Sequence, residues 1–143
     1  MMYSLLRKKV ILSTCIFLAL SLISCQKEEY RLPQDIIGTW LCDTIQGNIR
    51  YNVQITFYIN GYYRVKEDVY KYDTLTSMWA NPSDQEYSDK CFVKKNGDGT
   101  YSVELQRSKE NYIISGAIYN IEKDKMIALL FSWQKGAICF KRI

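Results

Sequence analysis

The sequence predicts an all-β domain, a sandwich or a barrel, that follows an N-terminal targeting segment. From Ile36 onward Tyr, Val, Ile, Phe and Thr are abundant, and the 143 residues include only two prolines. Apolar and polar side chains alternate in several segments, which is the period of a half-buried strand. Turn signals recur about every ten residues, which is typical of consecutive antiparallel strands.

The first 24 residues predict a cleaved signal peptide. Arg7, Lys8 and Lys9 form a basic start, and Val10–Ile23 is an apolar run. This run is too short for a membrane-spanning helix, which needs about 20 residues, but it suits a secretory signal. The stretch Leu22–Cys25 resembles the bacterial lipobox, in which a diacylglyceryl group is attached to the cysteine and the chain is cut before it.

Lipidation at Cys25 would solve an anchoring problem, because one acyl chain holds a protein only marginally whereas two or more give stable attachment. Gln26–Glu29 is similar to the charged signal that routes lipoproteins of Bacteroidetes-type bacteria to the outer face of the outer membrane. We therefore expect an outer-membrane, lipid-anchored protein exposed at the cell surface. The alternatives are an ordinary cleaved signal with a chance cysteine and a plain solvated tether. The expected organisation is a signal peptide (1–24), a lipidated cysteine and polar tether (25–35), and one β domain (36–143).

Composition argues against several functional classes. Three of the 19 basic residues lie in the signal segment and all 15 acidic residues follow it, so the remainder is nearly neutral and a nucleic-acid partner is not expected. There is no histidine, which removes Ser-His and Cys-His nucleophiles. Cys42, Cys91 and Cys139 match no zinc spacing and allow at most one disulfide. We expect neither catalysis, nor a cofactor, nor a metal site.

Strands are predicted at about 37–41, 51–57, 62–70, 90–95, 100–107, 112–121, 126–133 and 137–142. Gly116 inside its strand suggests a bulge or a bend. The stretch Lys71–Asp89 breaks the alternation, and Asn81-Pro82 followed by Asp84 is typical of a helix start. This stretch is either a short helix or lid, or an irregular connection.

The turn at Asn60-Gly61 admits two registers. A two-residue loop would pair Phe57 with Arg64 and direct cations to the apolar face. A three-residue loop would pair Phe57 with Tyr63, Ile55 with Val65 and Val53 with Glu67. Because a one-residue slip exchanges the two faces and a buried unpaired cation is costly, we favour the three-residue loop. The other register would create an anion-binding cavity.

Three short motifs resemble those of lipocalins. Gly38-Thr39-Trp40 matches the Gly-x-Trp motif at the start of the first strand, "ITFYINGYY" is similar to the following hairpin of bacterial lipocalin-like domains, and "CFKRI" resembles their final strand. The resemblance implies an antiparallel up-and-down β-barrel of about eight strands over Ile36–Ile143. It also implies that Trp40 closes the barrel floor and that Arg142 stacks on it as a cation–π pair, which is a structural role.

An eight-stranded barrel is either filled by its side chains or just wide enough for one small ligand. The leading hypothesis is non-catalytic binding of a small apolar or amphipathic ligand. The alternative is a filled-core interaction module that docks other surface proteins or glycans through its tyrosines. The segment 126–133 is apolar on both faces and so needs a cover, from the Asn81 region, the tether or another chain. By alternation alone, the candidate ligand-binding residues are Tyr51, Val53, Ile55, Phe57, Val65, Tyr101 and Val103.

Overall fold

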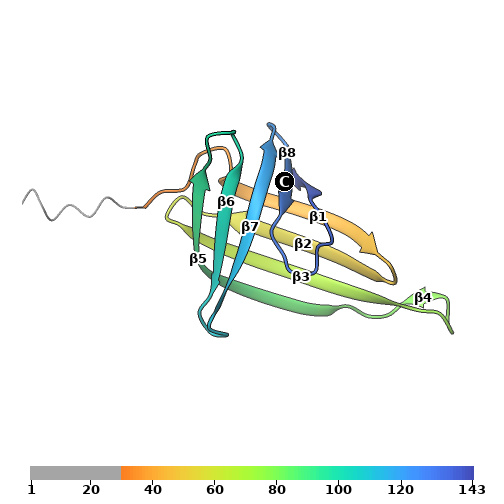
Figure 1. The fold of residues 1–143 in the computed structure, drawn as a ribbon. Coiled ribbons are helices and arrows are strands. Elements are labelled where there is room, and N and C mark those ends of the chain that lie inside the picture. The colour runs from red at the N-terminus through yellow and green to blue at the C-terminus, as the bar shows by residue number, and fades with distance from the viewer. Residues whose placement is uncertain (1–29) are drawn as a thin grey trace, which may run out of the picture.

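Eight strands follow one another around a closed antiparallel barrel in the computed structural model, which describes residues 30–143 (Figure 1). Each strand of the ring pairs with its neighbours in sequence, and β9 returns to pair with β1, so the predicted up-and-down barrel is confirmed. A two-residue strand, β4, pairs with β3 outside the ring. The expected signal peptide, Cys25 and the first tether residues lie outside the described residues. The strands are β1 (Gly38–Gln46), β2 (Ile49–Phe57), β3 (Tyr62–Asp73), β4 (Met78–Trp79), β5 (Ser83–Lys95), β6 (Tyr101–Arg107), β7 (Tyr112–Ile121), β8 (Lys125–Leu129) and β9 (Ile138–Arg142).

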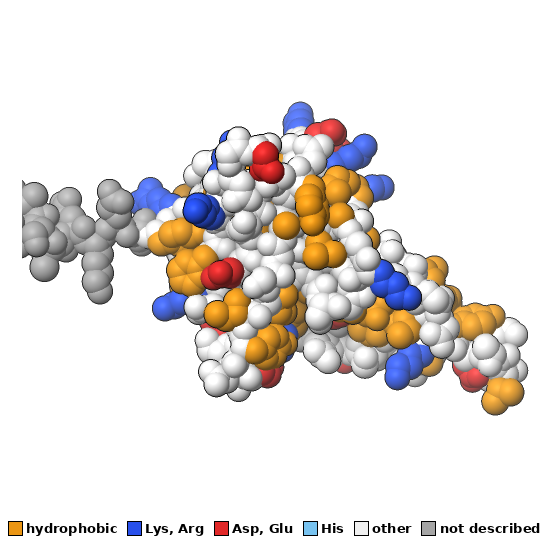
Figure 2. Space-filling view, in the orientation of Figure 1, with side chains coloured by type: hydrophobic (Ala, Val, Ile, Leu, Met, Phe, Trp, Pro, Cys, Tyr) orange, Lys and Arg blue, Asp and Glu red, His pale blue; other side chains and the backbone are white. Residues whose placement is uncertain are grey.

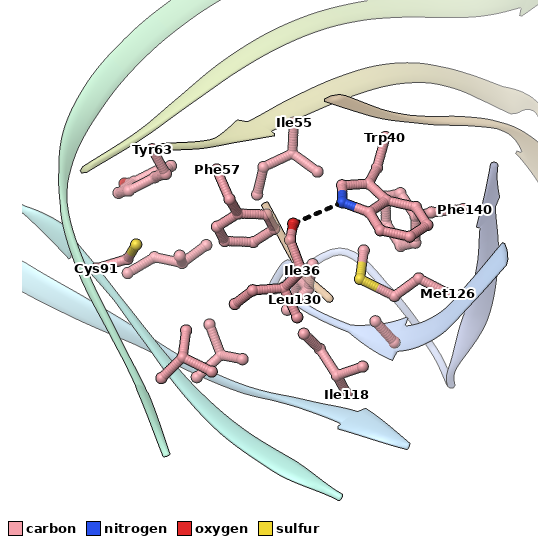
Figure 3. Packing of buried hydrophobic residues seen from close by; sticks show 14 of the residues in the cluster. Ile36, Trp40, Ile55, Phe57, Tyr63, Cys91, Ile118, Met126, Leu130 and Phe140 are labelled. Carbon is pink, nitrogen blue, oxygen red and sulfur yellow. Dashed lines mark hydrogen bonds between the residues drawn. The ribbon is translucent and has the colours of Figure 1, made fainter. Parts of the chain in front are cut away.

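The predicted register of the β2–β3 hairpin is confirmed. Phe57 lies opposite Tyr63 and Ile55 opposite Val65, which excludes the alternative register with buried cations. Gly61 has a φ of +80° in this turn, a conformation that glycine adopts without a steric penalty. The side chains that face inward near this turn are therefore apolar, and they pack in the core that Figure 3 shows.

The segment 30–37 crosses this end of the barrel, which we call the sealed end. Leu32 and Ile36 are buried in the core, and the carbonyl of Ile36 accepts a hydrogen bond of 2.9 Å from the Trp40 indole N–H. The opposite end, which we call the open end, carries the β1–β2 and β6–β7 turns, the long β3–β5 connection and the β8–β9 loop. All eight barrel strands and their core lie within residues 30–143, so this part of the chain contains what it needs to fold as a unit.

The expected stacking of Arg142 on Trp40 is confirmed. The guanidinium carbon of Arg142 lies 4.3 Å from the centroid of the fully buried Trp40 ring. The same guanidinium donates to the carbonyl of Ile37 at 2.8 Å and to that of Asp35 at 2.7 Å. Because β1 and β9 share only two residue pairs, this side chain supplies much of the connection between the first strand, the last strand and the N-terminal segment.

The expectation of a helix, a lid or an irregular connection at Lys71–Asp89 is wrong. β3 continues to Asp73 and β5 begins at Ser83, and the two strands pair from Val69↔Ser83 onward. Regular pairing satisfies the backbone groups of this polar stretch, and Pro82, which has no N–H to donate, sits just before β5. Beyond the barrel, β3, β4 and the turn between them form a projecting arm, residues 71–82 (Figure 1).

Two local expectations also need correction. Gly116 does not form a bulge, since the irregularity in β7 lies between Ile118 and Asn120. Gly116 instead allows a close backbone approach, because a Cβ there would lie 2.5 Å from the Leu129 carbonyl oxygen. β8 ends at Leu129 rather than near residue 133, since the Gln134 side chain accepts the N–H groups of residues 130 and 131 in place of a partner strand.

The inner face of β8 is buried, whereas its outer face is only partly covered. Met126 and Ala128 are completely buried, but Ile127 and Leu129 keep intermediate exposure on the outside of the barrel. Asn81, which was expected as a cover, is exposed and lies at the base of the arm. Within the described residues, the outward apolar side chains of β8 therefore remain partly exposed.

We predict that Arg142→Met destabilises the protein by about 2–4 kcal/mol, because two carbonyls lose their donor and Trp40 loses its cation. Urea unfolding of the two proteins measures the difference in free energy. Lys141→Met, one residue earlier and exposed on the outer face, is the matched control and should be nearly neutral. Equal effects of the two substitutions would contradict the role given to Arg142.

Candidate functional site

A split in the barrel wall opens a cleft of about 580 Å³ at the open end. β5 pairs with β6 only between Cys91 and Lys95, whereas its first half pairs with β3 alone. The two strands therefore separate on the N-terminal side of Cys91, toward the open end. The cleft lies between residues 85–89 of β5 and the start of the β6–β7 turn.

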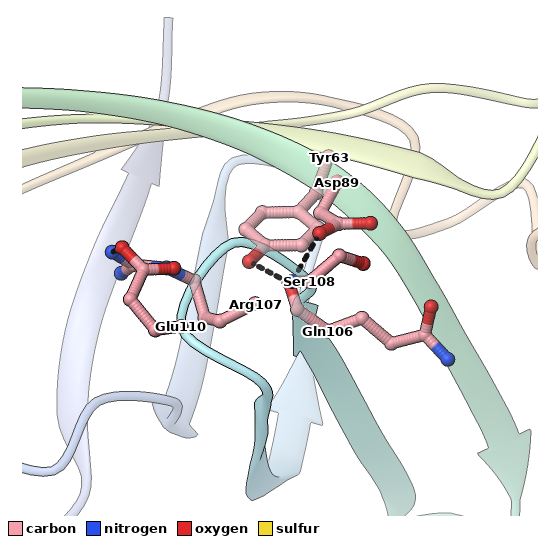
Figure 4. A network of polar contacts seen from close by, with 6 residues as sticks. All are labelled: Tyr63, Asp89, Gln106, Arg107, Ser108 and Glu110. Carbon is pink, nitrogen blue, oxygen red and sulfur yellow. Dashed lines mark hydrogen bonds and ion pairs between the residues drawn. The ribbon is translucent and has the colours of Figure 1, made fainter.

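Two hydrogen bonds hold the split at its narrow end (Figure 4). The Tyr63 hydroxyl donates to the carbonyl of Gln106 at 2.7 Å, and the backbone N–H of Ser108 donates to the Asp89 carboxylate at 2.7 Å. Burial opposes ionisation of Asp89, but hydrogen bonds from the backbone of Ser108 and Lys90 outweigh it, so the pKa is lowered. The carboxylate is therefore a fixed anchor for the β6–β7 turn.

Arg107 is the main cation of the cleft. Its guanidinium carbon lies 3.6 Å from the centroid of Tyr87 and 5.7 Å from that of Tyr112. Its Nε and Nη2 donate to the Glu110 carboxylate at 3.2 and 2.6 Å, which lowers the pKa of Glu110. Burial raises the pKa of Tyr87 to about 12. Arg107 is thus a positioned cation with an aromatic ring behind it.

Three stacked aromatic rings lie at the open end, and they are not among the residues that line the cleft. Trp133 stacks on Tyr51 with a centroid separation of 4.0 Å and on Phe131 with one of 5.6 Å, and both pairs are nearly parallel. The buried indole nitrogen of Trp133 has no hydrogen-bond partner among the described residues. A buried N–H without an acceptor in full hydrogen-bond geometry costs about 1–3 kcal/mol.

Glu67 lies between Arg107 of the cleft and Trp133 of the aromatic stack. Burial raises the pKa of this carboxyl, while the charge of Arg107 and the nearby indole of Trp133 act in the opposite direction. The Trp133 indole N–H acts on this carboxylate as a hydrogen-bond donor, although the pair does not reach full hydrogen-bond geometry. Glu67 lies opposite Val53 on β2 and Gln85 on β5, which places it on the inner face where the core gives way to the cleft.

The β8–β9 loop brings Phe131 and Trp133 to this position. The Gln134 side chain accepts the backbone N–H groups of Leu130 and Phe131 at 2.7 and 2.8 Å, and it donates to the carbonyl of Ala128 at 3.0 Å. This buried amide replaces strand pairing and turns the loop inward. Both aromatic rings then fold over the end of the core instead of continuing β8.

Most of the residues proposed from alternation lie in the packed core. A side chain that borders a cavity wide enough for water keeps accessible surface, and Val53, Ile55 and Val65 keep none. Tyr51 is the member of the set that reaches the aromatic stack at the open end. The remaining three candidates are at most 5% exposed: Phe57, Val103 and Tyr101. The Tyr101 hydroxyl donates to the Asp35 carboxylate at the sealed end.

The three cysteines of the described residues are free thiols. Burial raises the pKa of Cys42 to about 11 and that of Cys91 to about 12, so both remain protonated at neutral pH. Cys139 is exposed on β9. No group of three or more His, Cys, Asp or Glu side chains within residues 30–143 is placed to hold a metal ion.

Sequence reasoning did not select Glu67, Tyr87, Arg107, Tyr112 or Trp133. One signal was available, because the favoured hairpin register already placed Glu67 on the inner face opposite Val53. Alternation identifies the face of a strand but not the height along the barrel axis. It therefore could not separate the core positions from those at the open end.

Comparison with protein-family models, curated proteins and solved structures finds no match for this chain. Within the described residues, no helix has the length and apolar character needed to cross a membrane.

We predict that Glu67→Gln gains stability over wild type when the pH is raised from 4 to 7. Because the folded-state pKa of Glu67 is raised, the folded protein binds this proton more tightly than the unfolded chain. Stability is therefore lost as pH rises from the ordinary value of 4.5 through the raised one, and glutamine removes that loss. Urea unfolding at the two pH values measures the difference between variant and wild type.

Asp98→Asn is a control of opposite sign. Hydrogen bonds from Thr100 lower the pKa of Asp98, so its carboxylate contributes stability that is present above the ordinary value of 3.8 and is lost as pH falls through the lowered one. The disadvantage of Asp98→Asn should shrink only in that lower range, so its urea unfolding is also measured at a pH below 3.8. A Glu67→Gln effect that is the same at pH 4 and pH 7 would contradict the burial of this carboxyl.

Proposed function

We propose that this protein binds a small amphipathic molecule, without catalysis, at the open end of the barrel. The observation that carries the proposal is the unpartnered, buried Trp133 N–H, set in an aromatic stack beside the half-buried Glu67. Ligand sites are typically concave and aromatic, with a few polar groups that fix orientation. An apolar ring of the ligand would contact Tyr51 and Trp133, and its polar atoms would meet the indole N–H, Glu67 or Arg107.

The location of this site favours ligand exchange with the solvent. The sealed end is crossed by residues 30–37 and filled by the core, whereas the cleft opens beside Tyr87 and Arg107 at the other end. Arg107 keeps N–H groups beyond the two that bond Glu110, so it can also meet an anionic group of the ligand. Apolar area and charge of both signs therefore lie within one region, as an amphipathic ligand requires.

An aromatic amphipathic probe tests the proposal. We predict that N-phenyl-1-naphthylamine gains fluorescence on addition of the protein, and that Trp133→Leu weakens its binding about tenfold, because a stacked ring and an indole donor are lost. Trp79→Leu, which removes the partly exposed tryptophan of the arm, is the matched control and should bind the probe like wild type. No enhancement with wild type, or equal loss in both variants, would argue against an open-end site.

We also propose that the mature protein is a lipoprotein anchored at Cys25 and displayed on the outer membrane. The support is the sequence alone, namely the short apolar run, the lipobox-like stretch and the charged residues that follow. In cells fed labelled palmitate, the wild-type protein should incorporate label and Cys25→Ala should not. Equal labelling of the two proteins, or none in either, would remove the anchor from the account.

The arm supports a second candidate function, an interaction module for other surface proteins or glycans. Leu75 and Met78 at its tip are 95% and 65% exposed, and Tyr72 packs edge-on against Trp79 below them. The arm projects away from the barrel (Figure 1). Leu75→Ser with Met78→Ser should abolish partner binding under this reading and leave probe binding unchanged, which separates the two functions.

A further inference from the structure

A second exposed cluster lies at the sealed end, where the described chain begins. Tyr30 and Phe92 are both exposed, and their rings pack with centroids 5.4 Å apart. Tyr62 and Ile59, also exposed, belong to the same end. Figure 2 shows hydrophobic side chains together with basic ones and an acidic one on this side of the molecule. We call this surface, with Lys90 and Lys94, the anchor-side face.

Strand alternation places the two lysines on either side of Phe92. Lys90, Phe92 and Lys94 point outward from β5 because Cys91 and Val93 between them point into the core. A hollow of about 310 Å³ lies on one side of the Tyr30–Phe92 pair and includes Lys90. Another of about 270 Å³ lies on the other side and includes Lys94, with Glu104 as its one acidic residue. The face therefore alternates aromatic and basic groups.

The position of Tyr30 is fixed by the barrel. Its hydroxyl donates to the Val93 carbonyl at 3.0 Å, and its ring lies against Gly61, where a Cβ would approach within 2.9 Å. Cys25 precedes Tyr30 by five residues, which span at most about 18 Å when fully extended. A lipid attached at Cys25 would therefore hold the anchor-side face close to the membrane.

We propose that the anchor-side face rests on an anionic lipid surface. Tyrosine side chains of membrane proteins are enriched at the headgroup level, phenylalanine side chains of interfacial segments enter the boundary with the acyl chains, and anionic lipids attract lysines. The place where the chain outside the described structure must attach, and the two exposed lysines beside one glutamate, both point to this occupant. The contact would add to the acyl chains and would set the orientation of the barrel.

This contact has a consequence for the other end of the molecule. The sealed end would face the membrane, and the cleft and the arm, which lie at the opposite end, would face outward. The inference does not rest on ligand binding, since it uses other residues and another partner. The Cys25 anchor matters here only because it would bring this face close to the membrane. The vesicle experiment uses protein without acyl chains, so failure of the lipid contact can be told apart from failure of the anchor.

The test measures sedimentation of residues 25–143, with Cys25→Ser, together with vesicles. At low salt we expect binding to vesicles that contain phosphatidylglycerol and much weaker binding to pure phosphatidylcholine vesicles. Each of Lys90→Glu and Lys94→Glu should lower the partition coefficient at least about fivefold, and Tyr30→Ser with Phe92→Ser should lower it further. Thermal unfolding of each variant checks that the barrel is intact.

Lys66→Glu and Lys135→Glu make the same charge change on exposed positions away from this face and serve as matched controls. They should retain most of the binding. Three results would overturn the proposal: no binding of the wild-type chain to anionic vesicles, an equal loss in the control variants, or a dimer in solution that the Tyr30 and Phe92 substitutions abolish while lipid binding is absent. The last result would assign the face to a second copy of the chain.

Discussion

The contact of Arg142 with Trp40 and with the N-terminal segment is the constraint on which the rest of the structure depends. β1 and β9 share only two residue pairs, so the ring closes over a short seam. One guanidinium crosses this seam, stacks on the buried indole and binds the carbonyls of Asp35 and Ile37. It thereby fixes residues 35–37 at one end of the barrel. With that end sealed and its core filled, only the opposite end can admit a molecule from solution.

The length of β5 determines what the open end contains. The first half of β5 pairs with β3 and not with β6, and this departure separates the wall into two parts. Arg107 and Tyr87 line the resulting cleft, and Glu67 lies opposite Gln85 at its edge. The same strand ends at the sealed end with Lys90, Phe92 and Lys94 on its outer face. One long strand therefore links the two surfaces for which we propose partners.

Much of the barrel could be predicted from the sequence, because alternation and turn residues determine the faces of strands and their register. The pairing of Phe57 with Tyr63 followed from such patterns, whereas the stack of Arg142 on Trp40 was implied by the resemblance to lipocalins. The arm could not be predicted, since its residues are polar and gain order from pairing with β3. The Gln134 side chain that ends β8 was equally hidden, because one buried amide does the work of a partner strand. Apart from Tyr51, the residues of the candidate site were missed for a related reason. Alternation places Val53 and Glu67 on the same inner face, but it does not give their positions along the barrel axis. Val53 lies in the core, whereas Glu67 is only half buried, nearer the open end.

Native mass spectrometry of the mature protein, purified from its own host without denaturation, tests the central claim most directly. The claim is that the barrel is sealed at the Trp40 end and takes a small molecule at the Trp133 end. The account predicts one released small molecule per chain for wild type and for Trp79→Leu, with most of it lost from Trp133→Leu. A bare wild-type chain, or a molecule held equally by Trp133→Leu, would contradict it.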